Sequence, residues 1–277
     1  MPKNSHHRPS EKSIHTLGLT SVDNARDLGG YCTTHGQTVK YKKLLRMGKL
    51  SAISQEDIQR LRAEDVTLVL DLRTTQEITD FPDIHIPGAQ YLSLKILDEN
   101  AKDESRLMSS QYVNAIDSVQ GLVDLIASGR LTDNLYTGIL SSTYMQTQYR
   151  TFFKQILANA DHSTVFHCTG GKDRTGIAAV LLLTALGVDQ ETCLADFALT
   201  NLFYQEKIEA VLAQTKHLTE EPKILAGAAA LIGVDPIYME KLFNESKSQY
   251  GSMMNFLVQG IGLTHDDFIS LRKNFLE

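Results

Sequence analysis

Residues 164–176 read Thr-Val-Phe-His-Cys-Thr-Gly-Gly-Lys-Asp-Arg-Thr-Gly. The apolar and β-branched start of this segment predicts a short buried strand that ends at Cys168. Five residues then form a loop that contains two glycines, and Arg174 opens an apolar helix that runs to Leu186. A strand that passes through a tight loop into a helix is typical of α/β folds with parallel sheets.

The segments that precede it repeat this pattern. Residues 143–159 predict a helix, and residues 66–73 form a nearly continuous apolar run that ends in charged residues. Such a run is typical of a strand that is buried on both faces of a sheet. Residues 54–57 form a capping-box-like helix start, which predicts a helix to about Ala63. We therefore expect an α/β fold with a central, largely parallel sheet that is flanked by helices.

Two regions lie outside this alternation of strands and helices. Residues 29–39 contain Gly-Gly and His-Gly turn signals between β-prone pieces, and they predict a small sheet near the N-terminus. After Asp189 the sequence is helical in character to its end, with a second box-like cap at residues 264–267.

A third region, residues 98–141, is predicted to be a helical insertion. Its apolar residues recur at helical spacing on one face: Tyr112, Val113, Ile116, Val119, Leu122, Val123 and Ile126. The helix either packs on the core or forms a lid over the functional site, since insertions in such folds often cover active sites.

Composition limits the partners and the cofactors. The chain has 277 residues and a formal net charge of −6, whereas a general binder of nucleic acid or anionic membranes would be basic. Its three cysteines have no regular spacing, which indicates a reducing compartment rather than a disulfide framework. No Cys-x-x-Cys or His-Glu-x-x-His spacing occurs, so no metal or other cofactor is expected. No segment has the features of a signal peptide or of a membrane span, so we expect a cytoplasmic protein without membrane insertion.

The glycine-containing loop has the properties of an anion-binding site. A tight loop at a helix N-terminus directs backbone N–H groups inward, and the helix dipole adds positive potential. Gly170 and Gly171 allow backbone conformations that a side chain would forbid. The same field stabilises a thiolate at Cys168, and the planar guanidinium of Arg174 matches two phosphate oxygens. One segment thus predicts a nucleophile, an anion cradle and a charge clamp.

Other interpretations of this segment fit less well. A nucleotide-binding P-loop would need Gly at position 166 and Ser or Thr at position 173, where this chain has Phe and Asp. A cysteine at a strand end is, taken alone, more often a small buried hydrophobic residue. We interpret Cys32 and Cys193 as structural residues because they lack the loop context of Cys168.

Residues 167–176 resemble the signature loop of the protein tyrosine phosphatase superfamily. Asn24–Gly30, and Asp71–Arg73 together with Glu77, are similar to two upstream motifs of a microbial tyrosine-phosphatase family that has lipid-phosphatase relatives. The C-terminal stretch from Tyr250 is also similar to that family.

This resemblance extends from about Leu19 to the end of the chain. It implies one phosphatase domain, residues 19–277, with a protein tyrosine phosphatase-like fold after a flexible tail of residues 1–18. Asn24–Gly30 is interpreted mainly as a structural fingerprint. Asp71 and Arg73, at the charged end of a strand, are expected to line the pocket.

The residues permit a two-step mechanism. The Cys168 thiolate attacks phosphorus while an acid protonates the leaving oxygen, and water then hydrolyses the cysteinyl-phosphate. Asp173 is the first candidate for the acid, as in relatives whose loops carry Asp-Arg-Thr, and Asp133 and Asp71 are the alternatives. By resemblance, Thr175 would hydrogen-bond the sulfur and His167 would support the loop. The phosphate would be bound by the loop itself: Thr169, Gly170, Gly171, Lys172, Asp173 and Arg174.

The substrate is less sharply defined. Lys172 is a second cation beside Arg174, and it either reads a second phosphate on the substrate or only tightens binding of the reacting one. We expect phosphotyrosyl proteins, with phosphoinositides and phosphoserine or phosphothreonine proteins as further candidates. The alternative function is a catalytically weak phospho-binding module that uses the same anion nest. A sulfur transferase or arsenate reductase would have no evident use for Asp173-Arg-Thr.

Overall fold

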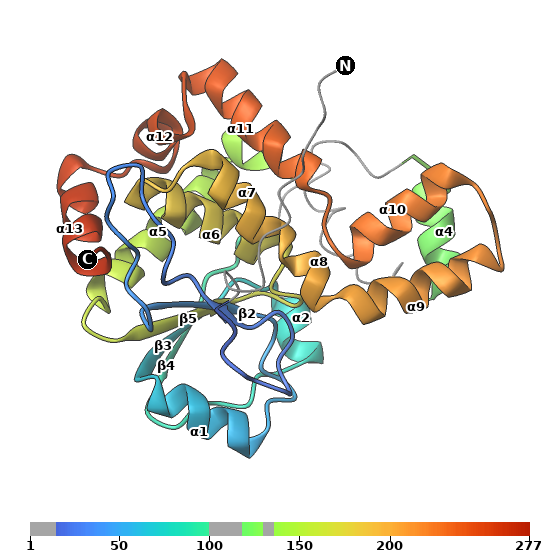
Figure 1. The fold of residues 1–277 in the computed structure, drawn as a ribbon, viewed down its shortest axis with the longest axis horizontal. Coiled ribbons are helices and arrows are strands. Elements are labelled where there is room, and N and C mark those ends of the chain that lie inside the picture. The colour runs from blue at the N-terminus through green and yellow to red at the C-terminus, as the bar shows by residue number, and fades with distance from the viewer. Residues whose placement is uncertain (1–14, 100–117, 130–135) are drawn as a thin grey trace.

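The computed structural model describes residues 15–99, 118–129 and 136–277, in which five strands form one mixed sheet (Figure 1). The strands are β1 (Arg26–Asp27), β2 (Leu44–Met47), β3 (Val66–Asp71), β4 (Gln90–Ser93) and β5 (Ser163–His167). Their order across the sheet is β1-β2-β5-β3-β4. The β1–β2 pair is antiparallel and the other pairs are parallel, which confirms the expected α/β fold.

The central strands are buried on both faces, as their apolar runs predict. Phe166 of β5 and Leu70 of β3 belong to one hydrophobic cluster, while Val165 and Val69 belong to another. Successive side chains of a strand point to opposite faces, so these alternating residues fill the two sides of the sheet. Helix α1 (Gln55–Ala63), capped by Ser54, covers the smaller cluster.

Helices from the C-terminal half cover the other face (Figure 1). These elements are α5 (Thr143–Ala158), α6 (Asp173–Leu186), α7 (Gln190–Ala198), α11 (Pro236–Tyr250), α12 (Met253–Phe256), η3 (Leu257–Ile261) and α13 (His265–Phe275). Short helices connect them and the strands: α2 (Thr75–Asp80), η2 (Thr137–Leu140) and α8 (Thr200–Phe203). The predicted helices at residues 143–159, at 174–186 and after 189 are confirmed, as is the cap at Thr264.

The predicted small N-terminal sheet is present only as β-bridges and not as regular strands. Residues 29–39 form isolated bridges instead of strands: Cys32 pairs with Thr38, Thr33 with Val188 and Val39 with Leu276. Strand β1 joins the main sheet through β2. The preceding residues are attached to this edge as well, because Asp27 N–H donates to His15 C=O at 2.9 Å. Residues 15–18 of the predicted tail are therefore bound to the fold.

Helices α4 (Val119–Ala127), α9 (Gln205–Lys216) and α10 (Pro222–Ile232) form a group at one side of the molecule (Figure 1). Leu122 and Ile126 of α4 pack with Ile224 and Leu231 of α10 in a hydrophobic cluster separate from the main core. The predicted insertion helix is thus seen from residue 119 onward, and it packs on α9 and α10. Its earlier apolar positions, Tyr112, Val113 and Ile116, lie outside the described residues.

Among the described residues, no single helix is long and apolar enough to cross a membrane. Helices α10 and α11 satisfy length and composition only as a pair, and the chain bends by 78° between them.

Candidate active site

The predicted loop lies at the carboxyl ends of three neighbouring parallel strands. His167, the last residue of β5, is level with Met47 of β2 and Asp71 of β3. Residues 168–172 follow, and α6 begins at Asp173. Ligands of α/β sheets bind at this edge because loops and helix N-termini converge there.

The loop carbonyl groups are turned outward, and each is held by a donor outside the loop. Thr169 C=O accepts from Lys49 N–H at 3.1 Å, Gly170 C=O from the Tyr204 hydroxyl at 2.9 Å, and Gly171 C=O from Asn24 Nδ2 at 2.8 Å and Arg46 Nη2 at 2.9 Å. The N–H of a peptide points opposite to its C=O, so the N–H groups of residues 170–172 face inward. None of them has an acceptor within the described ranges. This arrangement is an anion-binding nest.

Gly171 is the position where the loop touches the sheet most closely. Its φ is +64°, and a Cβ added there would lie 2.4 Å from the backbone C and O of Met47. A side chain would therefore both strain the backbone and collide with β2. Gly171 is therefore required both by the backbone conformation of the anion-binding nest and by the close packing of the loop on β2.

Cys168 is the first residue of the loop, and its thiol is free of disulfides. Its side chain is buried. The hydroxyl of Thr175, in the first turn of α6, is buried as well and has no hydrogen-bond partner among the described residues. The hydrogen bond to the sulfur implied by the resemblance is thus not formed in this structure.

Arg174 is paired with Glu77, a residue to which the sequence analysis gave no catalytic role. Nη1 and Nη2 each lie 2.6 Å from a different carboxylate oxygen of Glu77. Burial would raise the pKa of Glu77, but the hydrogen bonds from Arg174 lower it to about 2. Burial alone would lower the pKa of Arg174, and the bonds to Glu77 raise it instead. Both groups are therefore charged, and the pair holds the guanidinium beside the loop.

One edge of the Arg174 guanidinium stays available. Nη1 also donates to Leu72 C=O at 3.4 Å, so Glu77 and Leu72 together engage both Nη1 hydrogens and one Nη2 hydrogen. Among the described residues the Nε hydrogen and the second Nη2 hydrogen have no acceptor. An edge of this geometry can bind two oxygens of one phosphate.

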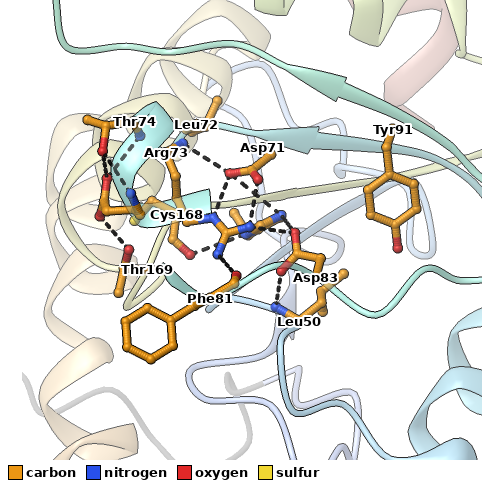
Figure 2. A network of polar contacts seen from close by, with 12 residues as sticks. Leu50, Asp71, Leu72, Arg73, Thr74, Phe81, Asp83, Tyr91, Cys168 and Thr169 are labelled. Atoms are coloured by element: carbon orange, nitrogen blue, oxygen red, sulfur yellow. Dashed lines mark hydrogen bonds and ion pairs between the residues drawn. The ribbon is translucent and has the colours of Figure 1, made fainter. Parts of the chain in front are cut away.

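Asp71 and Arg73 belong to a network of polar contacts at the carboxyl end of β3 (Figure 2). Arg73 is fully buried, with Nη2 2.7 Å from Asp71 and 2.8 Å from Asp83. Nε2 of His167 lies 3.1 Å from Asp83 on the other side. Two buried carboxylates therefore hold the Arg73 guanidinium in the interior, and the structure does not bring this side chain to the open side of the loop. These residues instead support the strand end that carries Cys168.

The same network bears on metal binding. Asp71, Asp83 and His167 offer three potential ligand atoms within 4.8 Å of one another. The Arg73 guanidinium already lies between the two carboxylates and provides the positive charge that a cation would bring (Figure 2). The donor set therefore fits an ion-pair network rather than a metal site.

Asp173 is the candidate acid that the structure places on the loop. Its carboxylate accepts a hydrogen bond of 2.6 Å from the Tyr136 hydroxyl, and its side chain is 35% exposed. Burial, together with the nearby Asp173, raises the pKa of Tyr136 well above its usual value, so Tyr136 stays a donor. Asp71 is engaged with Arg73 through both oxygens. The third candidate, Asp133, lies outside the described residues.

The Lys172 side chain is bound to the end of helix α10. Its ammonium donates to the carbonyl groups of Leu231 and, at 3.0 Å, Gly233, which end helix α10. It also lies 3.6 Å from the Asp173 carboxylate. In this structure Lys172 connects the loop to α10.

Sequence patterns assigned no role in the site to five residues whose side chains bind the loop, Asp173 or Arg174: Asn24, Arg46, Glu77, Tyr136 and Tyr204. The sequence contained a signal for one of them, since Glu77 completes a capping box with Thr74 at the start of α2. A second signal was the quoted Asn24–Gly30 motif, interpreted only as a fingerprint. Asn24 and Arg46 come from distant segments, and their contact with Gly171 follows from the sheet order.

Fold and site together define a class: phosphatases in which an anion-binding loop joins the central strand of a parallel-rich sheet to a helix. The chain matches the tyrosine phosphatase family over residues 17–277, and it belongs to that family. It is a protein-tyrosine phosphatase.

The relatives come from several bacteria. A Cupriavidus necator protein, provisionally named a tyrosine-protein phosphatase, is 27% identical over 96% of this chain and 90% of its own length. A tyrosine-protein phosphatase of Nostoc commune is 28% identical over 56% of this chain and 47% of its own length. The triple specificity protein phosphatase PtpB of Mycobacterium tuberculosis is 24% identical over 86% of this chain and 91% of its own length.

Proposed function

We propose that this phosphatase is cysteine-dependent and that it hydrolyses phosphotyrosyl proteins through a cysteinyl-phosphate intermediate. The observation that carries the proposal is the loop: Cys168 and Arg174 lie at the ends of a segment whose free N–H groups face inward. A phosphate dianion fits this combination of nucleophile, donors and planar cation. The names of two relatives support tyrosine phosphate as the substrate group.

In the first step the Cys168 sulfur forms a bond to phosphorus as the bond between phosphorus and the leaving oxygen breaks. Asp173 gives its proton to that oxygen, and the phenol of the substrate tyrosine leaves. Arg174 binds two equatorial oxygens through its Nε and Nη2 edge. The loop N–H groups bind the equatorial oxygens as well, over which the negative charge is spread in the transition state.

In the second step a water molecule attacks phosphorus and loses a proton to Asp173. The bond between phosphorus and sulfur breaks, which returns the thiolate and releases inorganic phosphate. The hydrogen bond from Tyr136 holds the Asp173 carboxylate at the loop in both steps.

The test compares the wild-type protein with Cys168→Ser on p-nitrophenyl phosphate and on a phosphotyrosyl peptide. The wild type should turn over, retain activity in EDTA and be inhibited by vanadate and by thiol alkylation. The variant should lose turnover yet still bind the peptide, because the loop N–H groups and Arg174 remain. Residual turnover near the wild-type rate would remove Cys168 from its proposed role.

The substrate range is tested on the same wild-type preparation. Phosphotyrosyl, phosphoseryl and phosphothreonyl peptides and a soluble phosphoinositide are compared by kcat/KM. We expect the phosphotyrosyl peptide to be the best substrate. A preference for the phosphoinositide would replace the protein substrate with a lipid one while leaving the cysteine mechanism in place.

A further inference from the structure

A second lysine, Lys49, lies beside the loop at Thr169. Its N–H donates to Thr169 C=O, which fixes its backbone against the loop. Its ammonium lies 3.6 Å from the centre of the Phe81 ring, just after α2. Phe81 is 44% exposed, and Figure 2 shows its ring at the end of the polar network where Thr169 lies. Lys49 and Phe81 therefore form one rim of the candidate active site.

Within the described residues, the Lys49 ammonium differs from Lys172 and Lys207 in having no carboxylate at ion-pair distance. Lys172 is bound to the end of α10, and Lys207 forms a 2.6 Å ion pair with Asp23. In the part of the chain that is described, no carboxylate lies within 4.0 Å of the Lys49 ammonium. Burial, and next the positive charge of Arg73, lower the pKa of Lys49. A cation that is partly withdrawn from water and close to another cation gains from an anionic ligand.

We propose that Lys49, resting on the Phe81 ring, recognises a carboxylate next to the phosphotyrosine of a peptide substrate. This inference rests on the proposed function and concerns the part of the substrate that does not react. In this proposal Lys49, and not Lys172, binds a second negative charge on the substrate, because the Lys172 ammonium already donates to backbone carbonyl groups.

The observations favour an acidic peptide over a membrane-bound lipid. Recognition of an anionic membrane surface uses a cluster of several Lys and Arg residues, whereas the described part of this rim has Lys49 beside the Lys207–Asp23 ion pair. The exposed face of Phe81 suits the apolar part of a peptide side chain. The formal net charge of −6 also disfavours approach to an anionic surface.

The experiment uses two phosphotyrosyl peptides that differ only in Glu or Gln at the positions on either side of the phosphotyrosine. The wild type should prefer the Glu peptide by about fivefold at low ionic strength, the upper range for an exposed charge pair. This preference should shrink as salt is added. Lys49→Met should abolish it by raising KM for the Glu peptide alone, because a contact far from the reacting bond stabilises substrate and transition state alike. Lys49→Arg should restore it.

Two further variants separate this role from a structural one. Phe81→Leu removes the ring but keeps the carbonyl that Arg73 uses, and it should reduce the preference only in part. Lys207→Met is the matched control, because that nearby lysine is already paired, and it should leave the preference unchanged. Turnover of p-nitrophenyl phosphate by Lys207→Met should match that of the wild type.

Failure of this inference is distinct from failure of the proposed function. If the wild type turns over p-nitrophenyl phosphate but Lys49→Met loses activity equally on both peptides, Lys49 supports the loop and reads no charge. An unchanged preference in Lys49→Met would also overturn the inference. Binding of the Glu and Gln peptides to Cys168→Ser, with and without Lys49→Met, measures the same preference without turnover. An inactive wild type would therefore contradict the proposed function and leave the test of Lys49 intact.

Discussion

At the residue scale, Glu77 controls how Arg174 is presented to a phosphate. Glu77→Gln keeps the shape of the side chain but places an amide donor against the guanidinium, so one hydrogen bond is replaced by repulsion. We expect the free energy of unfolding to fall by about 3 kcal/mol, as when one partner of a buried ion pair is removed. A fall in kcat/KM of more than tenfold should accompany it, measured on p-nitrophenyl phosphate.

The control is Glu99→Gln. Glu99 also accepts hydrogen bonds at the start of α2, from the N–H and hydroxyl of Thr75, but it does so at the surface. This variant should keep nearly full activity and stability. Equal effects of the two substitutions would show that Glu77 acts on α2 and not on Arg174.

Asp173 is the second residue whose role is open to a direct test. Asp173→Asn cannot donate a proton, so it should slow substrates with poor leaving groups, by about 10²–10⁴-fold. Substrates with good leaving groups need no protonation and should be affected much less. The measurement is kcat/KM across a series of substituted phenyl phosphates. An equal loss of kcat/KM for every substrate in the series would indicate a structural role for Asp173, and Asp133 would then be the next candidate for the acid.

At the scale of elements, the contact between the loop and strand β2 is the feature most sensitive to substitution. Gly171→Ala introduces a Cβ 2.4 Å from the Met47 backbone at a φ of +64°, so the loop must move. Gly36 has a φ of +80° and nothing within 4 Å of its added Cβ, which makes Gly36→Ala a control for backbone strain alone. Both should lose about 1–2 kcal/mol of stability from the left-handed conformation. Only Gly171→Ala should also lose phosphatase activity, and intact activity there would show that the loop tolerates displacement.

At the scale of the whole molecule, a buried charge cluster joins the N-terminal strands to α7. Asp196 lies 2.9 Å from Arg26 of β1 and 2.5 Å from Arg46 of β2. Burial would raise the pKa of Asp196, but the two arginines lower it to about 2, from an ordinary value of 3.8. Since Arg46 also holds Gly171, the cluster connects global stability to the shape of the loop.

The carboxylates of Asp196 and Glu77 predict how the stability of the fold depends on pH in acid. Folded-state pKa values of about 2 for Asp196 and Glu77 lie below the ordinary 3.8 and 4.5. Depressed carboxyl pKa values contribute stability that is present above the unfolded pKa and lost as pH falls through the folded pKa. The free energy of unfolding in urea should therefore decrease between about pH 4.5 and pH 2, and less steeply in Glu77→Gln. An equally steep decrease in that variant would assign the acid sensitivity to other groups.

The sequence alone determined the parts of this protein whose signals are local. The apolar runs at residues 66–73 and 164–168, the caps at Ser54 and Thr264, and the loop with its two glycines depend on neighbours a few residues away. The fold class, the family and the candidate roles of Cys168 and Arg174 follow from these short stretches.

Only the tertiary structure decided which distant side chains complete the site. Glu77 reaches Arg174 and Asn24 reaches Gly171 because β2, β5 and β3 lie side by side, an order that no local pattern encodes. The charged end of β3 could not be assigned to the pocket or to the interior from sequence. Ion pairs with Asp71 and Asp83 hold Arg73 inside, because a buried guanidinium requires anionic partners and the fold brings two carboxylates to it.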